Sequence, residues 1–207
     1  MGIIMDNNIM LYRKKFIEET MRQNLTMGVG QANALEISTL TSYGFKIAFL
    51  SGIEPVEFEG VTFGKYGLKG KFKCENPQEK GMTHKTPELK CSCGFYSFNN
   101  LKGALKMLTK YQGAVLILVE NYGVIVEHSH GYRAEIQEIK SILLPPTCSQ
   151  NFCFSEITHL SKGAHYYEGY CAKHALISER AITLSDIPKQ LGISLKILTP
   201  KEILISR

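Results

Sequence analysis

The spacing of apolar residues along the chain predicts two kinds of regular element. Apolar side chains recur every three or four positions, as on one face of a helix, at residues 9–25, 99–111, 172–182 and 185–191. Runs rich in β-branched and aromatic residues predict strands at residues 42–50, 56–63, 114–120, 124–127 and 193–198. Asn121-Tyr-Gly is expected to be a hairpin turn, and residues 131–142 fit either a strand or a helix. Because helices and strands do not alternate strictly, the pattern predicts an α+β fold.

The composition is that of a folded globular protein. Of the 207 residues, 44% are hydrophobic and 21% are charged, which excludes a wholly disordered chain. No apolar run reaches the roughly 18 residues of a membrane span. The first eight residues lack the basic and apolar regions of a secretory signal. We therefore expect a cytoplasmic protein without a membrane partner.

The six cysteines fall into two groups, and each group has one histidine close to it in the sequence. A reducing compartment disfavours disulfides, and cysteines of a hydrophobic core would be spread along the chain. Structural zinc takes four thiolate or imidazole ligands, and short spacings lower the entropic cost of enclosing the ion. Six cysteines and two histidines make two complete sets, so the sequence predicts two zinc ions. Reduced core cysteines are the alternative, but they leave the grouping unexplained.

The C-terminal ligand set consists of Cys148, Cys153, Cys171 and His174. Its order is a pair, a spacer of hairpin length and a second pair that opens a predicted helix. Ligands at positions i and i+3 of a first helical turn face the same way, so both can reach one ion. A knuckle, a hairpin and a helix that carries the last two ligands resemble a treble-clef zinc finger.

The N-terminal ligand set consists of Cys74, His84, Cys91 and Cys93. Cys91 and Cys93 form a tight clip, and the glycine that follows supplies the turn that a metal knuckle needs. His84 lies in a stretch of turn-forming residues and is the one histidine between cysteines of this set. The spacing therefore predicts a second closed zinc site.

With four protein ligands, neither predicted site has an open position at which a water molecule could be activated. The sequence also lacks the zinc-protease motif His-Glu-x-x-His and the His-x-Glu…Pro-Cys-x-x-Cys pattern of nucleobase deaminases. Phosphate-binding glycine loops and a Gly-x-Ser-x-Gly elbow are missing as well. The zinc ions are therefore predicted to stabilise the fold, and no residue is assigned a catalytic role.

Pro145-Pro146 is the best candidate for a domain boundary. The predicted organisation begins with an N-terminal helix or arm at residues 1–30. An α+β domain with a small mixed β-sheet and the first zinc knuckle follows at residues 31–146. Residues 147–207 are predicted to form the treble-clef-like zinc module.

Two further segments resemble a poorly characterised group of bacterial proteins. They are Cys91-Ser-Cys93-Gly-Phe-Tyr96 and Val124-Ile-Val-Glu-His128…Gly131-Tyr-Arg-Ala-Glu135, taken together with the other ligands of both sets. In that group, a Cys-x-Cys-Gly-[Ile/Phe]-Tyr segment precedes a Val-[Val/Ile]-Glu-His…Gly-Tyr-Arg-Ala-Glu region. The resemblance covers residues 42–198, although this chain lacks the tryptophans that such sequences often carry. It implies the two zinc sites and brings no established activity.

The formal net charge is +5, and the basic excess lies around the first ligand set, where residues 62–110 hold ten lysines and three glutamates. Within it, residues 63–73 interleave lysines with aromatic residues. Lysines can neutralise phosphates while aromatic faces stack on bases, so this segment is a candidate nucleic-acid-binding surface. Its proposed contact residues are Lys65, Tyr66, Lys69, Lys71 and Lys73. The alternative is a strand hairpin with solvated lysines and buried aromatic rings.

The sequence therefore favours a non-catalytic two-zinc protein that binds DNA, RNA or a protein through this basic-aromatic segment. One alternative is an enzyme that acts on a phosphorylated small molecule, because His128, Arg133 and Glu135 offer an acid/base pair and an anion-binding arginine. In a structural interpretation, these residues are a hairpin end with Arg133 paired to a glutamate. A further alternative is an inhibitor or adaptor that docks through the helix at residues 9–25.

Overall fold

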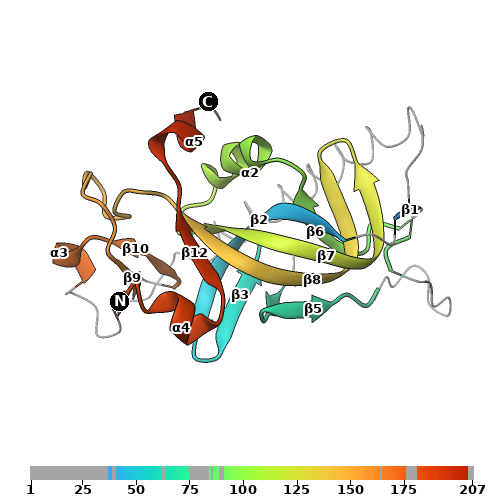
Figure 1. The fold of residues 1–207 in the computed structure, drawn as a ribbon, viewed down its shortest axis with the longest axis horizontal. Coiled ribbons are helices and arrows are strands. Elements are labelled where there is room, and N and C mark those ends of the chain that lie inside the picture. Colours follow the sequence, from blue (N-terminus) through green and yellow to red (C-terminus); the bar gives the residue numbers. More distant parts are fainter. Residues whose placement is uncertain are drawn as a thin grey trace, which may run out of the picture.

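Figure 1 shows the computed structural model of the chain, which describes residues 37–38, 41–61, 64–74, 84, 86–88, 91–163, 165–175 and 181–204. The predicted arm at residues 1–30, with its helix at residues 9–25, lies outside these ranges. Phe63 of the basic-aromatic segment also lies outside them.

Strands dominate the described part of the chain. They are β1 (Ile37–Ser38), β2 (Ser42–Ile53), β3 (Val56–Gly60), β4 (Lys65–Tyr66), β5 (Lys69–Lys71), β6 (Phe95–Phe98), β7 (Val115–His128), β8 (Gly131–Leu144), β9 (His159–Lys162), β10 (Tyr167–Tyr170), β11 (Ile182–Thr183) and β12 (Ser194–Ile197). The helices described are α2 (Leu101–Leu108), α3 (Ala172–Ala175), α4 (Ile187–Leu191) and α5 (Pro200–Leu204). The α+β prediction is thus confirmed only in part, because the sheet is extensive and the helices are short.

Four strands form a closed ring of antiparallel pairs. β2 runs antiparallel to β7, β7 to β8 and β8 to β6, and β6 returns to β2. β3 extends the pairing of β2, while β5 and β12 pair with later parts of β8. The two longest strands, β7 and β8, cross the middle of the molecule in Figure 1. The uncertain stretch at residues 131–142 is therefore a strand.

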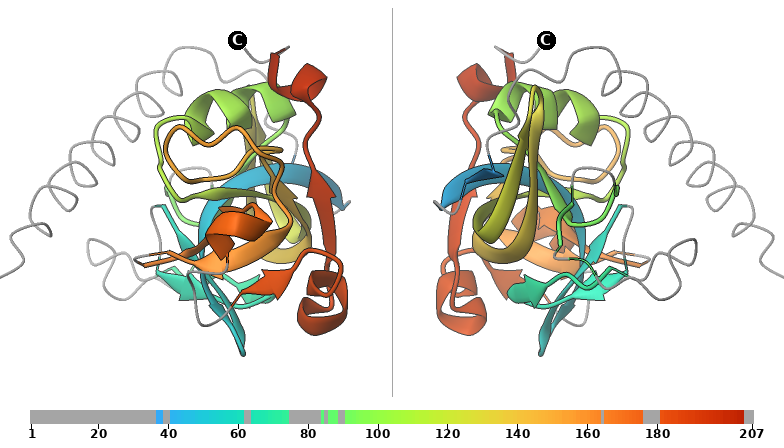
Figure 2. Two further views of the ribbon diagram at one scale, coloured as in Figure 1. Left: turned by 90° about the vertical axis from the view of Figure 1, so that its left-hand side faces the viewer. Right: turned by 90° about the vertical axis from the view of Figure 1, so that its right-hand side faces the viewer.

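Both faces are buried at residues 115–117 of β7 and 141–144 of β8, where the sequence is almost entirely apolar. One face carries the larger hydrophobic core, made of Ala48, Leu50, Ile53, Phe58, Val115, Ile117, Val119, Ile139, Ile142, Leu144, Ile157, Leu160, Tyr167, Ile187, Leu191 and Ile193. The other face packs against α2 through Ala104 and Leu105, and Figure 2 shows this helix lying over the strands. The Asn100 side chain caps α2 by accepting a hydrogen bond of 2.8 Å from the Gly103 N–H.

The predicted turn at Asn121-Tyr-Gly is wrong, because β7 continues through it to His128. Asn121 is fully buried, and its side chain is hydrogen-bonded to Gln137 and Ser97 instead of capping a turn. The register shifts between Tyr122 and Ile125, and Gly123 in this stretch has φ +72°. Residues that usually make a turn here make a bulge in a long strand.

The part after Pro146 shares the sheet with the part before it. β10 pairs with β2, and β12 runs parallel to β8. Residues from both parts also meet in the larger core. The division at residue 146 stays a prediction. Among the described residues, no helix has the length and apolar character needed to cross a membrane.

Candidate metal centres

The eight predicted ligands gather into two clusters, each with three cysteines and one histidine. The first metal centre comprises Cys74, His84, Cys91 and Cys93, and the second comprises Cys148, Cys153, Cys171 and His174. Within each centre, one ligand atom of every residue lies within 4.8 Å of the others. Each centre can therefore hold one metal ion.

The second centre is built from neighbouring segments of chain. Cys148 and Cys153 lie in a tight loop that is closed by a 2.9 Å hydrogen bond from the Cys148 N–H to the Ser155 carbonyl. β9 and β10 then form an antiparallel hairpin, and α3 begins immediately after Cys171. His174 lies in the single turn of α3, so the two ligands at i and i+3 reach the same point.

The ligand separations in the second centre fit a tetrahedral metal ion. The His174 Nδ1 atom lies 3.4 Å from the sulfurs of Cys148 and Cys171, and the Cys153 and Cys171 sulfurs are 3.9 Å apart. A tetrahedron with metal–ligand bonds of about 2.0–2.3 Å has edges of about 3.3–3.8 Å. A disulfide would place two sulfurs about 2.05 Å apart, and all six cysteines are free.

The first centre takes its ligands from loops next to the sheet. Cys74 follows β5, and Cys91 and Cys93 precede β6. The turn after this clip needs Gly94, because its φ of +116° disfavours any side chain. The Cys74 and Cys91 sulfurs are 3.6 Å apart, and the His84 Nε2 atom lies 3.3 Å from the Cys93 sulfur. These separations match the same tetrahedral edges.

Further groups surround the ligands of the first centre. The other ring nitrogen of His84, Nδ1, lies 3.5 Å from a carboxylate oxygen of Glu88. A carboxylate behind a ligating imidazole orients the ring and raises its basicity. The Arg133 guanidinium donates to the backbone carbonyls of Glu88, Cys91 and Cys93.

The surroundings of the sulfurs lower the pKa of one cysteine and raise the pKa of two others. A hydrogen bond from the backbone N–H of Ser155, helped by the Ser155 hydroxyl, lowers the pKa of Cys153 to about 6. Burial raises the pKa of Cys93 to about 11, and it also raises that of Cys148. A buried thiolate is thus costly on its own, and a divalent ion among three sulfurs offsets this cost.

The predicted small-molecule site contains one buried residue and two that are more open. Arg133 is buried, and its Nε donates to His128 Nε2 at 2.8 Å in addition to the carbonyl contacts. Burial, and then the charge of Arg133, lowers the pKa of His128. Glu135 pairs with Lys71 at 3.0 Å and accepts from the Val124 N–H. The arginine thus binds backbone carbonyls and a histidine rather than a glutamate, and the enzyme alternative stays a prediction.

The basic-aromatic segment separates into exposed lysines and inward-facing rings. Lys65 pairs with Glu57 at 2.9 Å, Lys69 with Glu138 at 3.2 Å and Lys71 with Glu135 at 3.0 Å. Lys73 is exposed beyond the end of β5. The Tyr66 ring stacks on Phe58, and burial raises the pKa of its hydroxyl. Phe72 packs edge-on against Phe95. The segment therefore presents amines, but not these rings, to a partner.

One buried lysine inside the sheet is not predicted by the sequence patterns. Lys46 donates to Gln137 Oε1 at 3.2 Å, and its Nζ lies 4.8 Å and 5.0 Å from the ring centres of Tyr66 and Phe95. Burial lowers the pKa of Lys46 to about 7. Both neighbours of Lys46 in the sequence are apolar, and this could have indicated a strand with two buried faces.

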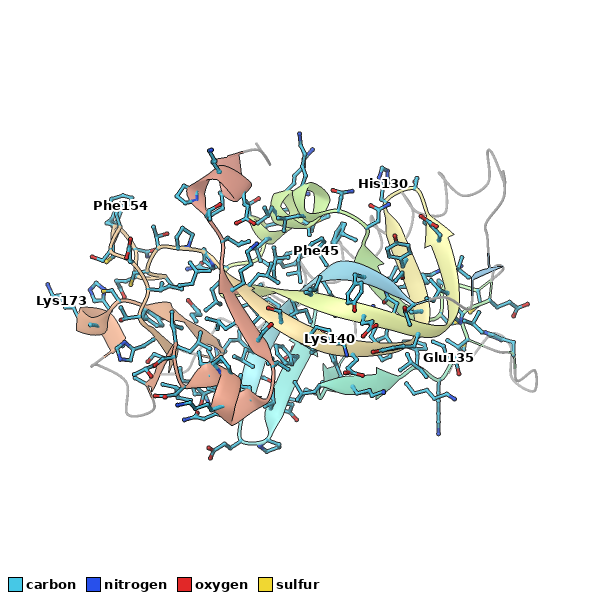
Figure 3. All side chains as sticks on the ribbon, in the orientation of Figure 1. Phe45, His130, Glu135, Lys140, Phe154 and Lys173 are labelled. Atoms are coloured by element: carbon cyan, nitrogen blue, oxygen red, sulfur yellow. The ribbon has the colours of Figure 1, made fainter. Side chains whose placement is uncertain are left out.

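Two exposed phenylalanines in the second centre are not predicted by these patterns either. Phe152 and Phe154 flank Cys153 and are 97% and 85% exposed. Figure 3 shows Phe154 and Lys173 at the end of the molecule that carries α3. The positions of Phe152 and Phe154 on either side of a metal ligand do not by themselves show whether their side chains point outward.

Comparison of the chain with known protein families, with curated proteins and with solved structures finds no match.

Proposed function

We propose that this chain is a non-catalytic zinc protein. Two structural zinc ions stabilise the fold, and the β-sheet carries a binding surface. One observation carries the proposal: two separate Cys₃His sets have ligand atoms within 4.8 Å of one another. Three thiolates and an imidazole are the ligands that zinc prefers, and four protein ligands leave no position for a substrate. We assign the knuckle, the β9–β10 hairpin and α3 to a treble-clef-like module.

Metal analysis of the purified chain tests the zinc assignment. We expect two zinc ions per chain, and one fewer in each of Cys91→Ser and Cys171→Ser. A Cys→Ser change keeps the size of the side chain but removes the thiolate. A wild-type chain with no bound metal, or one that holds another metal in preference to zinc, would contradict the assignment.

We propose nucleic acid as the partner, bound through the lysines of β4, β5 and the following residues. Lys65, Lys69 and Lys71 have side chains that are 60%, 62% and 63% exposed, although each is paired with a glutamate. A phosphate would have to replace the carboxylate of each pair. Tyr66 and Phe72 pack inside, so the contact is expected to be with phosphates and to depend strongly on salt.

Fluorescence anisotropy with a labelled 12-nucleotide single-stranded RNA, and with the same DNA sequence, tests this proposal. We expect binding at low salt that weakens as salt rises and is lost on Lys69→Glu plus Lys71→Glu. Lys102→Glu plus Lys106→Glu on α2 makes the same charge change on exposed residues elsewhere and is the matched control. Equal losses in both double variants would indicate attraction by net charge alone, and no binding by the wild type would leave a protein as the partner.

A further inference from the structure

Arg133 connects the first metal centre to the sheet. It is the third residue of β8 and is 4% exposed. One of its terminal nitrogens donates to the carbonyls of Glu88, Cys91 and Cys93, with lengths of 3.1 Å to Glu88 and 3.3 Å to Cys93. Three carbonyls of the loop that supplies two ligands are thus fixed by one side chain.

The charge of Arg133 matches the charge of an occupied first centre. An arginine side chain stays protonated in proteins, and a buried charge is costly unless it has a partner. Among the described residues, no carboxylate lies within ion-pair distance of Arg133. A divalent ion with three thiolates and one neutral imidazole has a net charge of −1, because three negative sulfurs exceed two positive charges. The guanidinium beside this centre supplies the opposite charge.

The same side chain reaches the turn between β7 and β8. The Arg133 Nε donates to His128 Nε2 at 2.8 Å, so this nitrogen accepts and the neutral ring carries its proton on Nδ1. His128 is the last residue of β7, and Ser129 and His130 form the turn that follows. His130 is exposed at this turn in Figure 3.

We propose that Arg133 is the positioning residue of the first metal centre and that it couples metal occupancy to the orientation of His128. The inference rests on the proposed function, since it requires a metal ion in this centre. When the ion is bound, its negative centre and the ordered carbonyls hold the guanidinium, and the guanidinium holds the imidazole. Because coupling between two sites is reciprocal, loss of the arginine weakens metal binding, and loss of the metal frees the histidine.

The second metal centre makes the experiment specific, because it has the same ligand types and lies after the far end of β8. Zinc affinities of both centres are measured by competition with a chromophoric chelator in the full chain, with Cys171→Ser and Cys91→Ser assigning the two phases. We expect Arg133→Met to lower the affinity of the first centre by about 10–100-fold and to leave the second within about twofold, as for other groups that orient metal ligands. Arg133→Lys keeps the charge without the fork of donors, so partial recovery is expected.

Lys140→Met is the matched control. It removes a positive charge from the same strand, where Lys140 pairs with Glu120 and Glu138 instead of the metal loop. We expect it to leave both zinc affinities unchanged. Equal weakening of both centres by Arg133→Met, or equal effects of the two Met variants, would overturn the positioning role.

A spectroscopic measurement on the wild-type chain covers the case in which Arg133→Met does not fold. Long-range ¹H–¹⁵N spectra report which imidazole nitrogen of His128 carries the proton. We expect one fixed tautomer, with the proton on Nδ1, in the zinc-loaded chain and in Cys171→Ser, and a mixture of tautomers in Cys91→Ser. An unchanged His128 signal in Cys91→Ser would overturn the coupling while leaving the zinc assignment intact. A wild type that binds no metal would instead remove the proposed function itself.

Discussion

The two metal centres have the same ligand types but obtain their geometry in different ways. In the second centre, a knuckle, a hairpin and one helical turn follow one another along the chain, and short local hydrogen bonds shape the loops. In the first centre, the ligands lie on loops, and Arg133 from β8 fixes the carbonyls between them. The second centre is therefore largely specified by its own segment of the chain, while the first depends on the sheet.

Removing one ligand from each centre should give the largest effects. We expect Cys91→Ser and Cys171→Ser each to lose one zinc ion and on the order of 5 kcal/mol of unfolding free energy, because metal binding contributes directly to folding. Hydrogen exchange should separate the two variants. Cys171→Ser should lose protection only near its own centre, in residues 147–156 and 171–175. Cys91→Ser should lose protection in the sheet, in β6 and in the first residues of β8.

The inner residues of the hairpin are the internal reference for that measurement. Leu160 and Tyr167 belong to the larger core, so they should stay protected in both variants. If Cys171→Ser exposes β8 as strongly as Cys91→Ser does, the distinction between a local and a sheet-dependent centre is wrong.

Lys46→Met should have the next largest effect, and it tests whether the sheet and the metal centres are energetically separate. Burial lowers the pKa of Lys46 to about 7, below the value of about 10.4 in an unfolded chain. Between these values the unfolded state binds more protons, so folding becomes more favourable as pH rises from 7 to 10. Replacing the amine by an apolar side chain should stabilise the protein by roughly 3 kcal/mol at pH 7.

Urea unfolding at pH 7 and pH 9 checks this prediction. The advantage of Lys46→Met should shrink to roughly 1 kcal/mol at pH 9, because the wild-type amine is neutral in the folded state and loses less on burial there. Thiol titration affects both chains and cancels in the difference. The zinc content should stay the same, since Lys46 contacts no ligand of either centre. A difference that does not change with pH would show that folding does not lower the pKa of Lys46.

The parts of this structure that were predictable from sequence are those with local causes. Both ligand sets, the α2 helix and most strands follow from short spacings and periodicity. The turn predicted at Asn121 does not form, because the buried Asn121 side chain accepts a hydrogen bond from Gln137 within the sheet. The roles of Arg133 and Lys46 depend on partners more than 40 residues away, Glu88 and Gln137, and spacing contains no information about them.

Glu88→Gln should have a smaller effect, limited to the first centre. The carboxylate lies 3.5 Å from His84 Nδ1, and its side chain is 45% exposed, so solvent weakens the interaction. Glutamine keeps the shape and the backbone contact with Arg133 but removes the charge. We expect zinc affinity at the first centre to fall by about threefold to tenfold, with the second centre unchanged as an internal control. Equal affinities in wild type and variant would show that Glu88 does not assist His84.

Phe152→Asn should give the smallest effect, and it tests a difference in backbone strain between the two knuckles. The first knuckle turns at Gly94, which tolerates its positive φ, whereas the second turns at Phe152, whose φ is +61°. A bulky residue in this left-handed region is strained, and asparagine adopts it more readily. Because the Phe152 ring is 97% exposed, its removal costs few packing contacts. We expect a gain of about 0.5–1 kcal/mol in thermal or urea unfolding, and no gain for the control Phe154→Asn, whose backbone has no positive φ. Equal changes in the two variants would mean that the second knuckle stores no strain at Phe152, so that both knuckles are equally relaxed.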